Sequence, residues 1–166
     1  AVTIAGELAA GCDVAVLCEG DPLFYGSFSY LLHRLGEQFP CVVIPGINSV
    51  SAAAAAAALP LITGEQRLTV IPATAGDEAI RQALLDSDSV AILKPGRHRP
   101  RLLALLQETG RTADTLYIEQ ASRPEQRIIS RFAEIPATPG PYFALILVVR
   151  SGNLAAPSFR SFIPRH

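Results

Sequence analysis

Two short loops hold most of the side chains in this sequence that could do chemistry. The first, "EGDPLFYG" at residues 19–26, places two carboxylates, two aromatic rings and two glycines around a proline. The second is "PGINS" at residues 45–49. A glycine lets a ligand approach the backbone closely, Asp21 can accept hydrogen bonds from hydroxyl or amino groups, and Tyr25 can stack on a ring. These loops therefore have a composition that suits a binding site for a small polar ligand.

The same residues also suit a purely structural role. Gly20 and the Asp21-Pro22 pair are typical of a tight turn, and Ser49 is typical of a helix start. Neither loop is a phosphate cradle, because the patterns GxxxxGK[ST] and GxGxxG are absent from the sequence. The three histidines are scattered and predict no metal site, and no Ser/His/Asp or Cys/His arrangement is visible.

Charge is distributed unevenly along the chain. Residues 1–66 carry one basic and six acidic side chains, whereas residues 67–166 carry thirteen basic and nine acidic ones. A basic second half suits an anionic ligand, but the overall net charge of −1 gives no indication of a nucleic-acid partner. No apolar stretch is long enough to span a membrane, and 49% of the residues are apolar, so we expect a compact cytoplasmic α/β protein.

Short β-rich runs alternate with helical patterns at the start of the chain. We expect the end of a helix at 2–10, buried strands at 13–18 and 41–44, and helices at roughly 28–38 and 50–59. This alternation predicts right-handed βαβ units and a parallel sheet. Both loops follow the carboxyl end of a predicted strand, which is where such sheets bind ligands.

Two strands alone are too few to bury both faces of an open sheet. We therefore expect that amino-terminal strands are missing from this sequence, or that another chain covers the gap. A linker pattern at 59–66 divides the chain into 1–62, the remainder of an amino-terminal domain, and 67–166, a carboxy-terminal α/β domain.

The three cysteines lack CxxC spacing and lie in apolar surroundings, which predicts reduced, buried thiols at Cys12, Cys18 and Cys41.

The second domain repeats the α/β pattern. Its last strands are expected to be neighbours in an antiparallel arrangement, which gives this domain a mixed sheet. The predicted strands are 67–73, 89–96 with its turn, 113–121, 126–135 and 141–150, and the predicted helices are 77–87 and 99–110.

The two loops, in this order, resemble those of the tetrapyrrole (corrin/porphyrin) methyltransferases. That family has a GDPxxYG loop, which matches residues 20–26, and a VPGxxS turn before an alanine-rich helix, which matches residues 44–49. The extended form "EGDPxFYGSFxYL", together with "LTVIPAT" and "LKPGRHRPRL", is most similar to the precorrin-2 C20-methyltransferase branch. The family's amino-terminal GxGPGD-like loop is absent, which agrees with an amino-terminal truncation.

The resemblance implies two α/β domains, the first with an incomplete parallel sheet, and S-adenosyl-L-methionine as cofactor. The protein would position the cofactor's methyl group in line with an electron-rich ring carbon, so no activated nucleophile is needed. Asp21, Tyr25 and His98 are the candidate proton acceptors. The implied cofactor contacts are Glu19, Gly20, Asp21, Phe24, Tyr25, Asn48, Ser49, Leu93, Lys94, Ala121, Tyr142, Phe143 and Ala144.

A polycarboxylate macrocycle is the implied substrate, and the basic second half offers cations to pair with its acid arms. The candidate substrate contacts are Arg97, His98, Arg99, Arg101, Arg123 and Arg127. The alternative, purely structural interpretation is that these residues form a solvated helix start and a solvated hairpin. The resemblance also implies a homodimer, for which the apolar 141–149 segment would tolerate burial.

Other functions remain open at this point. Within the family, the substrate could be the cobalt-loaded factor II, or methylation could take place at another ring position. Outside it, the chain could be a non-catalytic nucleotide-binding module or a fragment that serves subunit contacts. A truncated chain could also lack part of the cofactor site and be inactive.

Overall fold

The computed structural model describes residues 1–150, which fall into two compact units, residues 1–48 and residue 49 onward. This division lies closer to the amino terminus than the predicted linker at 59–66. It follows from the third helix, α3 (Ser49–Ala56), which buries Val50, Ala53 and Ala54 and packs on a strand of the second unit.

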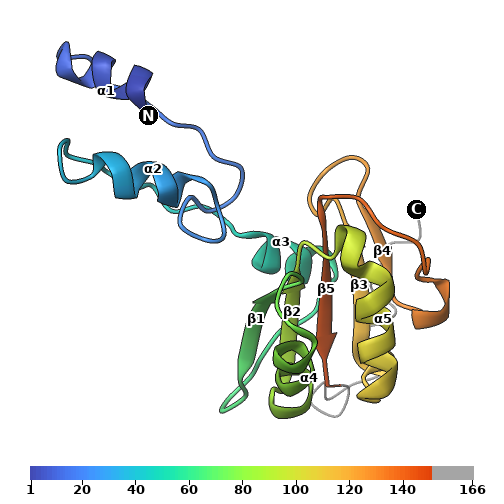
Figure 1. The fold of residues 1–166 in the computed structure, drawn as a ribbon. Helices are drawn as coiled ribbons and strands as arrows, with labels where there is room; N and C mark the ends of the chain where they lie inside the picture. Colours follow the sequence, from blue (N-terminus) through green and yellow to red (C-terminus); the bar gives the residue numbers. More distant parts are fainter. Residues whose placement is uncertain (151–166) are drawn as a thin grey trace. The chain divides into compact units, whose positions relative to one another are not determined.

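The first unit contains two helices joined by extended segments (Figure 1). They are α1 (Val2–Ala9) and α2 (Phe28–Leu35), both close to the predicted ranges. Gly11 ends the first helical region with a φ of 83°, a conformation that glycine adopts without strain. Ser27 makes no side-chain cap to α2, and Ser29 instead donates its hydroxyl to the carbonyl of Gly26.

The predicted strands at 13–18 and 41–44 are wrong. Both segments are extended but belong to no sheet, because neither has a hydrogen-bonded neighbour strand within residues 1–150. None of residues 1–48 is fully buried, and Leu17 and Val42 are 95% and 89% exposed. The prediction of buried thiols fails for the same reason, since Cys12, Cys18 and Cys41 lie on or beside these segments and are all exposed.

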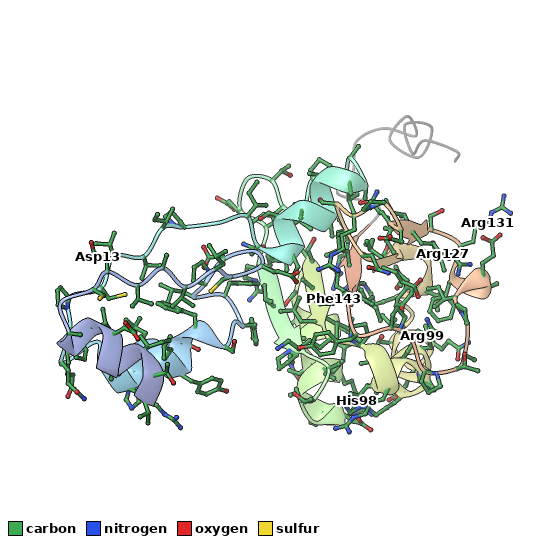
Figure 2. All side chains as sticks on the ribbon, turned by 90° about the horizontal axis from the view of Figure 1, so that it is seen from above. Asp13, His98, Arg99, Arg127, Arg131 and Phe143 are labelled. Atoms are coloured by element: carbon green, nitrogen blue, oxygen red, sulfur yellow. The ribbon has the colours of Figure 1, made fainter. Side chains whose placement is uncertain are left out.

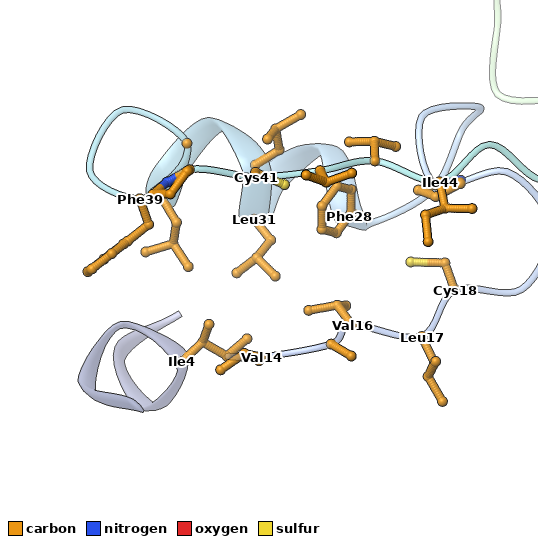
Figure 3. A pocket seen from close by; sticks show the side chains of 18 of the residues that line it. Ile4, Val14, Val16, Leu17, Cys18, Phe28, Leu31, Phe39, Cys41 and Ile44 are labelled. Carbon is orange, nitrogen blue, oxygen red and sulfur yellow. The ribbon is translucent and has the colours of Figure 1, made fainter. Parts of the chain in front are cut away.

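A cavity of about 520 Å³ lies within the first unit, between these extended segments and the helices (Figure 3). The side chains that line it are apolar or cysteines, and backbone supplies the polar part of the surface. Ile4 reaches it from α1, Phe28 and Leu31 from α2, and Val14 and Ile44 from the extended segments.

The second unit is built on a five-stranded mixed sheet in the order β1-β2-β5-β3-β4, which confirms the predicted mixed arrangement. Strands β1 and β2 are parallel, and β5 is antiparallel to both β2 and β3. The strands are β1 (Leu68–Pro72), β2 (Ser89–Leu93), β3 (Thr115–Glu119), β4 (Arg127–Ile129) and β5 (Ala144–Val149).

The helices α4 (Asp77–Asp86) and α5 (Arg99–Glu108) cover one face of this sheet (Figure 1). Alternate residues of the central strands, such as Ile92 and Ile146, pack into the core beneath them. The intervening residues of β5 are buried too, and α3 contacts that strand. Burial on both faces explains the continuous apolar runs in β2 and β5.

Two details of the second unit differ from prediction. The strand expected at 126–135 is only three residues long and gives way to a turn of 3-10 helix at Phe132–Glu134. The strand expected at 141–150 does not pair with β4 but lies in the centre of the sheet, between β2 and β3. All six residues of β5 are buried inside the unit, so within the segment 141–149 only residues 141–143 are exposed, and the homodimer stays a prediction.

Candidate functional site

The Asp21 loop (residues 19–26) and the Gly46 loop (residues 45–48) are tied together by one carboxylate. Asp21 accepts a hydrogen bond from the backbone N–H of Leu23 at 2.9 Å, within its own loop. Its other oxygen accepts from the backbone N–H of Gly46 at 3.1 Å, 25 residues along the chain. The charged acceptor therefore fixes both the shape of its own turn and the position of the second loop.

Glycines make this close approach possible. Gly20 has a φ of 76°, in the left-handed region that favours glycine. A Cβ added at Gly46 would collide with the carbonyl oxygen of Gly20 and would lie 2.9 Å from its carbonyl carbon. Neither atom belongs to a side chain that could rotate away, so the two loops pack backbone against backbone.

Two aromatic residues belong to the Asp21 loop. Phe24 and Tyr25 pack edge to face with ring centroids 5.4 Å apart, and Tyr25 is 45% exposed. Tyr25 also has a φ of 53°, which is uncommon for a residue with a side chain and marks a conformation held by its surroundings. The predicted contacts Glu19, Gly20, Asp21, Phe24, Tyr25 and Asn48 all lie in these two loops, whereas Ser49 is the first residue of α3 and belongs to the second unit.

The second unit gathers its candidate residues at one edge of the sheet. The antiparallel central strand brings the carboxyl ends of β1, β2 and β3 and the amino end of β5 to the same side, which we call the carboxyl edge. Two backbone hydrogen bonds link segments at this edge. The Gln120 N–H donates to the Phe143 carbonyl at 2.8 Å, and the Gly140 N–H donates to the Gly96 carbonyl at 2.9 Å. The predicted contacts that lie there are Leu93, Lys94, Ala121, Tyr142, Phe143 and Ala144.

Strained backbone is concentrated at the carboxyl edge. Lys94 follows β2 with a φ of 56°, and Gln120 follows β3 in the equivalent position with a φ of 48°. Ser122 is left-handed as well, with a φ of 65°. Such conformations persist where the surrounding structure enforces them, and they are common at ligand sites. Sequence reasoning missed Gln120 and Ser122, because neither residue type signals a left-handed conformation.

Exposed aromatic rings and cations share this edge. Tyr142 and Phe143 pack edge to face with centroids 5.1 Å apart and are 68% and 47% exposed. The Arg123 guanidinium lies 4.3 Å from the centroid of the Phe143 ring, close enough for a cation–π contact. Arg97 is exposed and its Nε donates to His98 at 3.3 Å, while Arg127 is exposed on β4 opposite Glu119.

Two of the candidate arginines instead bind the protein itself. Arg99 is 3% exposed and contacts backbone carbonyls, a tyrosine and a carboxylate (Figure 2 shows its position in the second unit). Arg101 is half-buried, with its guanidinium directed to the carbonyls of Ala73 and Ala75 and to the carboxylate of Asp77. Of the other four basic candidates, Arg97 and Arg127 are exposed and His98 and Arg123 are half-buried.

The described part of the chain has neither a candidate metal site nor a candidate membrane-spanning helix. Residues 1–150 contain no group of acidic, histidine and cysteine side chains that could hold a metal ion. Among the helices of the same residues, none has the length and apolar character needed to cross a bilayer.

Comparison with known proteins identifies the family. The model of the tetrapyrrole (corrin/porphyrin) methylases matches residues 1–136. The chain belongs to the tetrapyrrole methylase family. Within that family, the chain is 40% identical over 148 residues to a precorrin-2 C(20)-methyltransferase of Sinorhizobium, a match that covers 89% of this chain and 60% of that protein.

Two further tetrapyrrole methylases are similar to this chain. A cobalt-precorrin-2 C(20)-methyltransferase of Salmonella typhimurium is 33% identical over 93% of this chain and 66% of its own length. The crystal structure of a uroporphyrin-III C-methyltransferase from Thermus thermophilus with S-adenosylhomocysteine has a TM-score of 0.66 and 22% identity, and covers 89% of this chain and 71% of that one. This structural likeness confirms the fold. The chain spans less than two thirds of the length of either curated relative.

Proposed function

We propose that this chain is part of an S-adenosylmethionine-dependent enzyme that methylates precorrin-2 at C20 in cobalamin biosynthesis. The observation that carries the proposal is the 40% identity to a precorrin-2 C(20)-methyltransferase over most of the chain. The structure supports it through the Asp21 loop and the Gly46 loop, which are the two motifs of the resemblance and are joined by a hydrogen bond from Gly46 to Asp21.

The residues present fit S-adenosylmethionine chemically. The cofactor has an adenine ring, ribose hydroxyls and a cationic sulfonium, and these groups suit exposed aromatic faces and hydrogen-bond acceptors. Tyr25 offers such a face in the first unit, and Tyr142 and Phe143 do so in the second. Glu19 and the backbone around Gly20 would accept hydrogen bonds in the Asp21 loop, and the backbone at Leu93, Ala121 and Ala144 would do so at the carboxyl edge.

When bound, the sulfonium supplies an activated methyl group, so the protein's work is to orient the reactants and exclude water. Asp21 serves this role by holding two loops in register through backbone N–H groups. Because both of its oxygens accept these hydrogen bonds, we assign Asp21 a positioning role rather than that of proton acceptor. Tyr25 and His98 remain the candidates for accepting a proton.

The substrate's carboxylate arms would pair with the cations that reach solvent at the carboxyl edge. We propose Arg97, His98, Arg123 and Arg127 for this role, because these candidates are exposed or half-buried, whereas Arg99 is buried and Arg101 is directed to backbone carbonyls. Arg123 is already oriented by the Phe143 ring. Pairs of this kind are charge-assisted and screened by salt, so substrate affinity should fall as ionic strength rises.

Calorimetric titration of S-adenosylhomocysteine into the full-length protein tests the cofactor assignment. Asp21→Asn removes the charge that joins the loops and should weaken binding by about tenfold, since a hydrogen bond to a charged group contributes about 1.5 kcal/mol. Asp13→Asn is the matched control: it removes the same charge from an exposed position in the same unit (Figure 2). Equal affinities for both variants would remove Asp21 from the cofactor site.

A second substrate is favoured by one comparison. The Salmonella relative acts, by its name, on cobalt-precorrin-2, so the cobalt-loaded macrocycle is the alternative substrate for this chain. Parallel assays with the metal-free and cobalt-loaded macrocycles decide between them by the ratio of kcat/KM. The homodimeric state and the cytoplasmic location stay predictions, and sedimentation of the full-length protein tests the former.

A further inference from the structure

Arg99 makes an unusual set of contacts for a charged residue at the start of a helix. Its side chain is 4% exposed. Nε donates to the Thr138 carbonyl at 2.7 Å and Nη2 to the Pro139 carbonyl at 3.3 Å. Nη1 donates to the Tyr117 hydroxyl at 2.9 Å and lies 3.3 Å from the carboxylate of Glu119. One guanidinium therefore joins α5, β3 and the segment that leads into β5.

The contacts on Thr138 and Pro139 have consequences for the residues that follow. Gly140 packs so tightly here that an added Cβ would collide with the Tyr117 hydroxyl and lie 2.8 Å from Nη1 of Arg99. Its N–H also donates to the Gly96 carbonyl at 2.9 Å. The chain is thus fixed immediately before Tyr142 and Phe143, the exposed aromatic pair of the carboxyl edge.

Burial makes this arrangement rigid. The side chain of Tyr117 is completely buried, and burial raises its pKa to about 12, so its hydroxyl keeps its proton and accepts the bond from Arg99. The charge of Arg99 is balanced by Glu119, whose side chain is 16% exposed. A buried charge held by several partners resists displacement, because losing any partner leaves a polar group unpaired out of water.

We propose that Arg99 is a positioning residue for the cofactor, one that fixes segment 138–143 and so sets the placement of Tyr142 and Phe143. The inference rests on the proposed function, since it assigns those rings to the cofactor. It replaces the role of substrate contact that the sequence suggested for Arg99. In this role the Arg99 side chain contacts neither the cofactor nor the substrate, and it acts only through segment 138–143.

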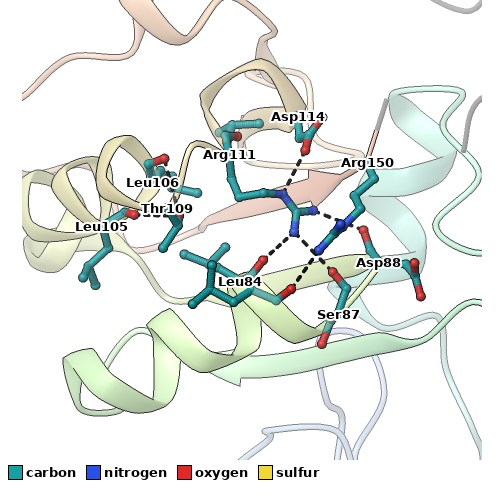
Figure 4. A network of polar contacts seen from close by, with 11 residues as sticks. Leu84, Ser87, Asp88, Leu105, Leu106, Thr109, Arg111, Asp114 and Arg150 are labelled. Carbon is teal, nitrogen blue, oxygen red and sulfur yellow. Dashed lines mark hydrogen bonds and ion pairs between the residues drawn. The ribbon is translucent and has the colours of Figure 1, made fainter. Parts of the chain in front are cut away.

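A second arginine provides a matched control. Arg111 is 6% exposed and donates to the carbonyls of Leu84, Ser87 and Asp88 at 2.5 to 3.2 Å, and to the Asp114 carboxylate at 2.8 Å (Figure 4). These partners precede β2 and β3, so they lie at the opposite edge of the sheet. Arg111 has the same chemistry and burial as Arg99 but no contact with segment 138–143.

The test compares Arg99→Met, Arg99→Lys and Arg111→Met in the full-length protein. Hydrogen exchange is measured at the amides of Gly140 and Gln120, whose bonds cross the carboxyl edge. The KM for S-adenosylmethionine, kcat and the affinity for S-adenosylhomocysteine are measured at a temperature where every variant is folded. Arg99→Lys keeps the charge and can restore one of the bonds, so it serves as a partial rescue and as the variant to use if the methionine variant does not fold.

We expect Arg99→Met to raise exchange at these two amides and the cofactor KM by about tenfold each, with a smaller change in kcat. Arg99→Lys should give values between those of Arg99→Met and wild type. Arg111→Met lowers global stability, but it should leave local opening at these two amides and the cofactor KM unchanged. Unchanged exchange in Arg99→Met, or equal changes in Arg99→Met and Arg111→Met, would overturn the positioning role. If the wild-type protein binds no S-adenosylhomocysteine, the proposed function and the link to the cofactor fail together, while the exchange data still report whether Arg99 holds the loop.

Discussion

Replacing Gly46 by alanine gives the sharpest test of the contact between the two loops of the first unit. The new Cβ would collide with the Gly20 carbonyl oxygen, and the Cα of Asp21 would lie 3.4 Å away. Only backbone atoms oppose it, so the loops must separate. The hydrogen bond from Gly46 to Asp21, now 3.1 Å, would lengthen beyond bonding distance.

The size of the effect follows from two contributions. Loss of a partly exposed bond to a carboxylate costs about 1 kcal/mol, and forcing a methyl group against fixed backbone costs about another 1 kcal/mol. If S-adenosylmethionine requires the joined loops, binding must restore them against this cost of about 2 kcal/mol, and affinity should fall about 30-fold.

Isothermal titration of S-adenosylhomocysteine into the full-length variants measures this loss. Gly6→Ala is the control, because Gly6 is in the same unit and an added Cβ there meets nothing within 4 Å. In the interior of α1 that substitution should favour the helix by about 1 kcal/mol and leave affinity unchanged. Equal affinities of Gly46→Ala and Gly6→Ala would show that cofactor binding does not depend on the contact between the two loops.

Three further predictions concern other parts of the chain. Arg111→Met should lower the free energy of unfolding by about 3 kcal/mol, seen as a lower urea midpoint, because it removes the buried donors to the carbonyls of Leu84 and Ser87 and the ion pair with Asp114; a midpoint within error of wild type would contradict this. The raised pKa of Tyr117, about 12, means that the folded protein holds this proton more tightly than the unfolded chain, so its contribution to stability is present below pH 10 and is lost as the pH rises toward 12. Tyr117→Phe should remove the last tyrosine to ionise in an ultraviolet titration, and a titration curve unchanged at its alkaline end would disprove the assignment. All three thiols of the 166-residue chain should react with a thiol reagent without denaturant, and a protected Cys12, Cys18 or Cys41 would show that its segment is covered.

The second unit is the part of the fold that the sequence predicts well. Its central strands are continuous apolar runs and its helices have clear apolar faces, so period and composition agree with the final burial. The order of the strands was not predictable in the same way. Strand β5 lies between β2 and β3, and this position depends on pairing between residues 25 to 60 positions apart in the sequence. The local sequence pattern of a strand does not indicate which distant strand it will pair with.

In the first unit, the predicted strands did not form. Segments 13–18 and 41–44 have the composition of buried strands, but composition reports only a tendency toward burial. A strand also needs a neighbour to pair with its backbone, and residues 1–150 provide none for these segments. The exposure of Leu17 and Val42 is the consequence.

The candidate site was also predicted only in part. The sequence identified Lys94 and Arg123, which do lie at the carboxyl edge. It grouped Arg99 with the candidate substrate contacts, because the basic residues cluster after one predicted strand, where they could pair with carboxylate arms. The side chain of Arg99 turns inward to carbonyls 39 and 40 residues further along, and no local pattern reports such contacts.

The proposed function is transfer of a methyl group to C20 of precorrin-2 by the enzyme to which this chain belongs. The direct test incubates the full-length protein with precorrin-2 and S-adenosylmethionine labelled with carbon-13 in the methyl group, and locates the label in the product by NMR. We expect a single labelled methyl at C20, with S-adenosylhomocysteine formed in equal amount. A label at another ring carbon, or cofactor binding with no transfer to either the metal-free or the cobalt-loaded macrocycle, would contradict it.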